Sequence, residues 1–206
     1  MYARSTTIMA RPDTIDAGIA HIRDEVMPSL MAMDGCIGLS MMCDQESGRC
    51  IATSAWRTEE AMRASTEQVR ALRDNAADMM GGKADVEEWE IAVLHRSQQW
   101  TEGNCVRATW MRVDPADAER GIDIFKMASL PAMDQLDGFC SASLLVDRAT
   151  GRACTSVSFS DAGAMERSRE TANAMRERGM TEAKAEMLDE GEFELVLAHL
   201  HVPEHV

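Results

Sequence analysis

The chain has 206 residues, of which 45% are hydrophobic and 27% charged, a composition typical of globular proteins. Its 35 Asp and Glu outnumber 21 Lys and Arg, which gives a formal net charge of −14. Proteins that bind nucleic acids or anionic membranes need a basic face, so we expect neither kind of partner. No apolar run is long enough to span a bilayer and the N-terminus lacks a signal-peptide core, so we expect a cytoplasmic protein.

The first half of the chain predicts the order strand, helix, strand, strand, helix, strand. Residues 3–10 are rich in Thr and apolar side chains, as strands are, and apolar residues recur at helical spacing over 15–26. The Asp34-Gly35 pair indicates a turn, and two strand-like runs around the segment QESG predict a hairpin. Thr58 is expected to start the second helix, and EEWEIAVLH to form the last strand.

The second half predicts the same order. Residues 105–113 resemble a strand, and Asp114 with Pro115 is a helix start. After Asp137-Gly138, two strand-like runs flank the turn RATG, Ser160 is expected to begin the second helix, and GEFELVLAH is the last strand.

The two halves align with each other. Shifted by 103 residues, the sequence matches itself at many positions, and after a one-residue insertion Glu88, Glu90 and His95 meet Glu192, Glu194 and His199. We therefore predict a tandem duplication, with repeat 1 over residues 1–97 and repeat 2 over 104–206. The identical pairs include Arg4 with Arg107, Thr6 with Thr109, Gly18 with Gly121, Pro28 with Pro131, and Gly48 with Gly151.

The order β-α-β-β-α-β is that of the ferredoxin-like unit, whose helices cover one sheet face and leave the other open. Two tandem copies can cover these open faces by packing them together. We therefore predict an α+β fold in which two fused ferredoxin-like repeats form a dimeric-type α/β barrel, as one compact pseudo-twofold body. We expect a monomer of this kind (a pseudo-dimer) or a homodimer of it.

The sequence resembles the dimeric α/β-barrel superfamily and, within it, the antibiotic-biosynthesis-monooxygenase-like (ABM) domains. The resemblance rests on the element order, on P-x-x-x-x-x-D-G at 28–35 and 131–138, and on D-x-x-x-G-R at 44–49 and 147–152. It also rests on an aromatic residue, Trp56 or Phe159, that ends the third strand. It implies a small monooxygenase that needs no cofactor. The haem-degrading relatives use an Asn on the first strand, which this chain lacks.

The paired His95 and His199 are candidate catalytic bases, because His exchanges protons near neutral pH. Alternatively, they cap strand ends in solvent. The paired Arg4 and Arg107 are candidate substrate-binding residues, because a buried guanidinium can hold an anion. The alternative for these arginines is an ion pair with Glu90 or Glu194.

Trp110 and Trp56 are candidate walls for an aromatic substrate, or alternatively core residues. Trp110 stands where repeat 1 has Thr7, so one half is expected to keep a pocket that the other fills. Cys43 and Cys50 are expected to face each other across the first hairpin as packed thiols. The spacing of Cys and His matches no metal site, so we expect no metal and no cofactor.

These observations support two functions. The first is a cofactor-independent monooxygenase-like protein that acts on or binds a small aromatic or polycyclic compound, with desolvation and orientation supplied by a pocket. The second is a non-catalytic barrel that binds an apolar ligand or serves as a scaffold. The lining of the space between each sheet and its helices distinguishes them.

Overall fold

The computed structural model describes residues 1–200, which form two compact units. Unit 1 consists of Met1–Trp89 together with the strand residues from Glu194 onward, and unit 2 consists of Glu90–Phe193. Each unit contains the predicted order of strands and helices.

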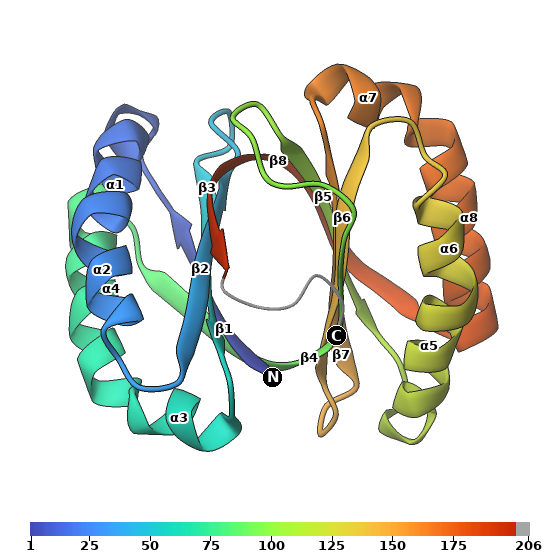
Figure 1. Cartoon of the computed structure of the whole chain (residues 1–206), viewed down its shortest axis with the longest axis horizontal. Helices are drawn as coiled ribbons and strands as arrows, with labels where there is room; N and C mark the ends of the chain where they lie inside the picture. Colours follow the sequence, from blue (N-terminus) through green and yellow to red (C-terminus); the bar gives the residue numbers. More distant parts are fainter. Residues whose placement is uncertain (201–206) are drawn as a thin grey trace. The chain divides into compact units, whose positions relative to one another are not determined.

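In unit 1, one helical segment follows the first strand, and two shorter helices follow the hairpin. Its elements are β1 (Tyr2–Met9), η1 (Pro12–Thr14), α1 (Ile15–His21), η2 (Ile22–Val26), α2 (Met27–Met31), β2 (Cys36–Cys43), β3 (Arg49–Trp56), α3 (Glu59–Ala64), α4 (Thr66–Met80) and the first part of β4 (Ala84–Arg96). In Figure 1, α1, α2 and α4 lie along one face of these strands.

Unit 2 repeats the series. Its elements are β5 (Cys105–Arg112), η3 (Pro115–Asp117), α5 (Ala118–Ile124), η4 (Phe125–Ser129), α6 (Leu130–Met133), β6 (Phe139–Asp147), β7 (Arg152–Phe159), α7 (Ala162–Arg167), α8 (Arg169–Ala183) and the first part of β8 (Glu186–Leu200). Helices α5, α6 and α8 cover one face of its strands (Figure 1). In both units the middle of the first helical segment, η2 or η4, is a π-helix, which the apolar periodicity did not predict.

The last strand of each repeat passes from one unit into the other. Residues Glu90–Arg96 of β4 pair with β6 in unit 2, and the residues of β8 from Glu194 pair with β2 in unit 1. The hydrogen-bonded strand order is the closed series β1-β3-β2-β8-β5-β7-β6-β4. This order confirms the predicted α+β fold of two fused ferredoxin-like repeats whose strands form an α/β barrel. The boundaries of the compact units therefore differ from those of the sequence repeats. The unit boundaries fall within β4 and β8, whereas the two repeats are joined by the linker around residues 97–104.

The helix starts follow local hydrogen bonding. The Thr58 hydroxyl accepts a bond from the Ala61 N–H, so Thr58 starts α3 as predicted. In repeat 2 the prediction of Ser160 was wrong by one residue, because the Asp161 carboxylate accepts the bond from Ala164 N–H. The prediction for the first hairpin is confirmed: Cys43 pairs with Cys50 across β2 and β3, and both are buried free thiols.

A cavity between the helices and the sheet of unit 2

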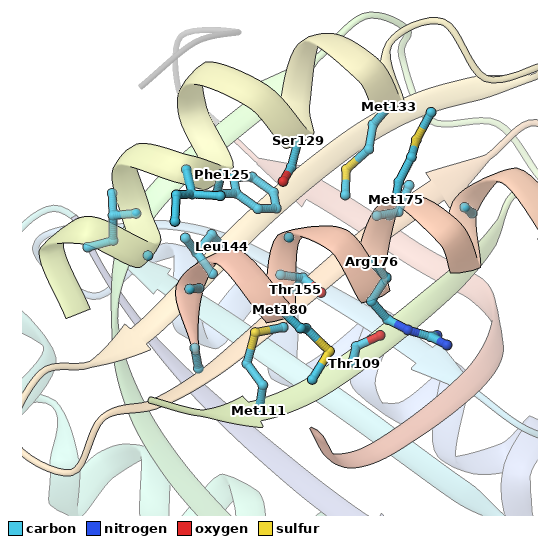
Figure 2. Close-up of a pocket in the computed structure, with 18 of the residues that line it drawn as sticks. Thr109, Met111, Phe125, Ser129, Met133, Leu144, Thr155, Met175, Arg176 and Met180 are labelled. Carbon is cyan, nitrogen blue, oxygen red and sulfur yellow. The ribbon is translucent and has the colours of Figure 1, made fainter. Parts of the chain in front are cut away.

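Unit 2 contains an apolar cavity of about 100 Å³ between its helices and the strands β5, β6 and β7. Figure 2 shows Phe125, Ser129 and Met133 reaching into it from the first helical segment, opposite Met175 and Met180 of α8. Met111 of β5 also lines the cavity, so four of the lining residues are methionines. Met side chains are unbranched and rearrange easily, so this lining can adapt to a guest.

Arg107 supplies the most deeply buried charge in the lining. It lies on β5 with 5% of its surface exposed. Its Nε and Nη2 donate to Oε1 of Glu192 at 2.9 and 2.7 Å, and Nη2 also donates to the Met165 carbonyl at 3.3 Å. The third nitrogen, Nη1, is buried and has no hydrogen-bond partner among the described residues. Arg107, which lines the cavity, therefore keeps one buried donor that the protein does not use.

A network of ion pairs surrounds the Arg107 guanidinium. Glu192 also forms an ion pair with Arg169 at 2.8 Å, and Arg169 forms a second ion pair with Glu166 at 2.6 Å. Arg176, which lines the cavity, pairs with Glu190. Burial acts to raise the pKa of Glu192, but the hydrogen bonds from Arg169 and Arg107 outweigh it and hold that pKa below its ordinary value. Glu192 is therefore ionised at neutral pH.

The corresponding space in unit 1 is half as large, about 50 Å³. Met80, the last residue of α4, is fully buried in the unit 1 core. In the repeat alignment its place is taken by Ala183 at the end of α8, and Ala183 lines the larger cavity. The side chain that fills unit 1 is thus missing from unit 2.

Arg4 of unit 1 also lies at the edge of its cavity but has all its nitrogens bonded. Its Nη1 donates to the Ser65 hydroxyl at 3.2 Å, and its Nη2 donates to Thr66 Oγ1 at 3.0 Å. In unit 2, Arg169 stands in place of Thr66, and the Ser168 hydroxyl donates to the Asp137 carbonyl. The two predicted arginines are therefore equivalent in sequence but differ in hydrogen bonding.

Both arginines form ion pairs, although the predicted partners were wrong. Arg4 pairs with Glu88 at 2.8 Å, not with Glu90, and Arg107 pairs with Glu192, not with Glu194. The partners lie two residues earlier on the same strands, a spacing that returns to the same strand face. The alternation of apolar and polar residues along β4 and β8 shows which residues share a face, but not which of them lies opposite the arginine of the neighbouring strand.

The predicted bases lie outside the cavity lining. His95 Nε2 lies 3.2 Å from Asp134 Oδ1 and 3.0 Å from Ser97 Oγ, and its ring stacks against Phe139. His199 lies opposite Leu39 on β2 and is half-buried. The structure does not bring either histidine into contact with the cavity of unit 2, whose lining residues include no Asp, Glu or His.

The two predicted tryptophan walls also lie elsewhere. Trp110 lies on β5 between Thr109 and Met111, which line the cavity, so its side chain is on the other face of the sheet. There it meets the Phe193 ring edge to face at 6.4 Å. Trp56 is fully buried in the unit 1 core and donates its Nε1 to Ser54 Oγ. The halves do differ in pocket size, and the cavity of unit 2 is lined by smaller residues at two paired positions: Ala183 in place of Met80, and Gly179 in place of Ala76.

Two other features are absent from residues 1–200, the part of the chain that the structure describes. Within that part of the chain, no group of His, Cys, Asp and Glu is arranged to hold a metal ion. No helix among the same residues is long and apolar enough to cross a membrane.

Sequence comparison places the chain in a family. The profile of the antibiotic biosynthesis monooxygenase family matches residues 1–74, the greater part of repeat 1. Repeat 1 of the chain therefore belongs to the antibiotic biosynthesis monooxygenase (ABM) family. Two uncharacterised proteins of Mycobacterium tuberculosis, Rv2557 and Rv2558, are similar over the whole chain: they are 58% and 54% identical, with 92% and 88% of their own lengths covered.

Solved structures share the fold of this ABM protein. A candidate monooxygenase from Lactobacillus acidophilus superposes with a TM-score of 0.71 at 12% identity, covering 97% of this chain and 96% of that one. An anthrone oxidase-like protein superposes with a TM-score of 0.68 at 11% identity, covering 98% and 94%. At such identities the similarity shows the fold alone, so the chemistry must be argued from the site.

Proposed function

We propose that this ABM protein binds a small aromatic compound in the cavity of unit 2, with Arg107 as its polar contact. The observation that carries the proposal is a buried guanidinium nitrogen without a partner at the edge of an apolar cavity. Ligand sites are commonly apolar pockets with a few placed polar groups. Unit 1, whose cavity is half the size and whose arginine is fully bonded, offers no equivalent site.

The size of the cavity favours a single ring. An apolar cavity of roughly 150 Å³ in another protein holds benzene. The cavity of about 100 Å³ in unit 2 is smaller, but its Met111, Met133, Met175 and Met180 side chains can move to admit one ring. A compound of several fused rings would require the helices to separate from the sheet.

Calorimetric titration with p-cresol tests this proposal. We expect one binding site per chain in the wild-type protein, and loss of binding in Ala183→Met, which places in unit 2 the side chain that fills unit 1. The control is Ala84→Met, a substitution on β4 away from the cavity, which should bind as the wild type does. Absence of p-cresol binding to the wild-type protein, or equal affinity in Ala183→Met, would contradict the proposal.

A second candidate function is cofactor-independent oxygenation of the bound compound, which membership of the ABM family favours. In such a reaction a base removes a proton from an activated ring carbon, and the carbanion reduces O₂. One oxygen atom becomes a carbonyl of the product and the other leaves as water. The Nη1 of Arg107, which has no partner in the protein, would donate a hydrogen bond to the substrate oxygen. The predicted bases, His95 and His199, do not line this cavity, so ligand binding is the better supported of the two functions.

Oxygen uptake distinguishes the two candidates. The wild-type protein is incubated with 1,4-hydroquinone, a compound of one ring, and oxygen uptake is compared with that of Ala183→Met and of His95→Gln and His199→Gln. Oxygenation in the cavity predicts uptake that Ala183→Met abolishes. A histidine that acts as the base predicts, in addition, a loss of at least about 100-fold in its own variant, the usual scale of general base catalysis. Binding without uptake would leave ligand binding as the function.

A further inference from the structure

The unpartnered nitrogen of Arg107 distinguishes unit 2 from unit 1. Buried polar groups are nearly always hydrogen-bonded, because an unsatisfied donor loses its bonds to water without replacement. Arg4 meets this requirement within the protein through Ser65. Arg107 does not: no hydrogen bond joins its Nη1 to the equivalent Ser168 or to any other described residue. A ligand atom that accepts a hydrogen bond would complete the shell of Arg107.

The charges around Arg107 decide which acceptor fits. Three guanidinium groups, those of Arg107, Arg169 and Arg176, are paired with three carboxylates, and the network has no net charge. The carboxylates are those of Glu166, Glu190 and Glu192. An anionic ligand would therefore add an uncompensated negative charge next to an apolar cavity, which is unfavourable. An uncharged oxygen would accept the bond without that penalty.

We propose that the cavity of unit 2 selects a one-ring compound with an uncharged carbonyl oxygen, and that Nη1 of Arg107 donates the hydrogen bond that recognises it. The proposal rests on the proposed function, because it names the ligand class of the same cavity. It excludes aromatic carboxylates, although a lone buried arginine is often taken to mark an anion site. Arg107 differs from such a lone arginine because its charge is already neutralised by the ion pair with Glu192.

Three probes of nearly equal shape test the ligand class: acetophenone, α-methylstyrene and benzoate. They present to Arg107 a neutral oxygen, a methylene group and a carboxylate. Because hydrogen bonds from charged donors are strong, we expect acetophenone to bind at least about tenfold more tightly than α-methylstyrene. We expect benzoate at pH 7 to bind more weakly than acetophenone by a similar factor. Dissociation constants are measured by calorimetry with the whole chain.

The conservative variant Arg107→Lys tests the role of Nη1. It retains a positive charge opposite Glu192 but removes the guanidinium fork, so the preference for acetophenone over α-methylstyrene should fall to less than about threefold. The affinity for α-methylstyrene itself should change little, which shows that the cavity persists. Arg4→Lys is the matched control in unit 1 and should leave the preference unchanged.

The outcomes separate this inference from the proposed function. If the three probes bind equally, or benzoate binds most tightly, and Ala183→Met abolishes their binding, the cavity is a ligand site but the carbonyl selection is wrong. If no probe binds, or binding survives Ala183→Met, the proposed function itself is wrong. A preference for acetophenone that persists in Arg107→Lys would exclude Arg107 as the donor.

Discussion

Met80 lies directly over Gly18: a β-carbon on Gly18 would come within 2.7 Å of Met80 Cγ. The equivalent Gly121 in unit 2 faces Ala183, where the same β-carbon would stand 3.9 Å from Ala183 Cβ. This exchange of Met for Ala leaves space beside Gly121, and the cavity of unit 2 is twice as large as that of unit 1.

Exchanging these two residues should have opposite effects on stability. Met80→Ala removes a fully buried side chain from the unit 1 core and should lower the free energy of unfolding by about 2–5 kcal/mol. Ala183→Met adds its side chain to existing free space and should change the free energy of unfolding by less than about 1.5 kcal/mol. Urea denaturation measures both. A larger loss in Ala183→Met than in Met80→Ala would show that the cavity of unit 2 cannot accept a methionine.

The two glycines should respond differently to alanine. Gly121→Ala places a β-carbon in ordinary contact distance within α5 and should stabilise the protein by about 0.4–1 kcal/mol, because alanine loses less backbone freedom in a helix. Gly18→Ala should destabilise it by about 1–3 kcal/mol through the collision with Met80. Thermal denaturation compares the variants. In a Met80→Ala background Gly18→Ala should no longer destabilise, and persistence of the loss there would refute the collision.

Acid should destabilise the protein in part through Glu192. Burial opposes ionisation of this carboxyl, but the hydrogen bonds from Arg169 and Arg107 prevail and lower its pKa. A carboxyl whose pKa is lower in the folded state stabilises that state above its unfolded pKa, about 4.3 for Glu. This contribution is lost as the pH falls through the lowered value.

The melting temperature measured between pH 7 and pH 3 checks the contribution of Glu192. Glu192→Gln should melt at a lower temperature than the wild-type protein at pH 7. Its melting temperature should then fall less steeply below pH 4.5, because the titrating group is absent. Parallel curves for the two proteins over this range would mean that Glu192 does not contribute to acid sensitivity.

The paired thiols of the first hairpin should be unreactive in the folded protein. The hydrogen bond with Cys50 and burial raise the pKa of Cys43, whereas the same hydrogen bond lowers the pKa of Cys50. Both side chains are only 1% exposed, so burial keeps the reagent from either sulfur. Since the thiolate is the reactive form, iodoacetamide at pH 8 should modify neither residue until the protein unfolds. Cys36, the one cysteine that is not buried, should react first. Mass spectrometry of the labelled peptides identifies the order, and early labelling of Cys43 would contradict the packing of the hairpin.

Much of the fold was predictable because each repeat carries local signals twice. The Asp-Gly turns before β2 and β6, the hairpin turns, and the helix start at Thr58 depend on neighbouring residues, so their positions follow from short stretches of sequence. The π-helical segments were not predictable from apolar spacing, because a π-turn shifts the helix face by one residue without changing composition. The extent of β4 and β8 was likewise missed, since strand length depends on which neighbours are available for pairing.

The candidate site was predictable only in part. The repeat alignment identified Arg107 as one of a pair, but His95, His199, Trp110 and Trp56 do not line the cavity of unit 2. Ala183, which leaves the cavity open, carries no chemical signal in the sequence. The alignment of Met80 with Ala183 is one sequence trace of this difference, and its meaning depends on what each side chain contacts.

The sequence by itself determined the duplication, the element order and the ferredoxin-like fold of each repeat, because periodicity and turn chemistry are properties of neighbouring residues. The tertiary structure alone decided which repeat keeps a cavity and which arginine keeps an unused donor. Those properties depend on packing and hydrogen bonding between residues far apart in the chain: Met80 against Gly18, and Ser65 against Arg4. Two repeats with the same local pattern can therefore differ in function through a few long-range contacts.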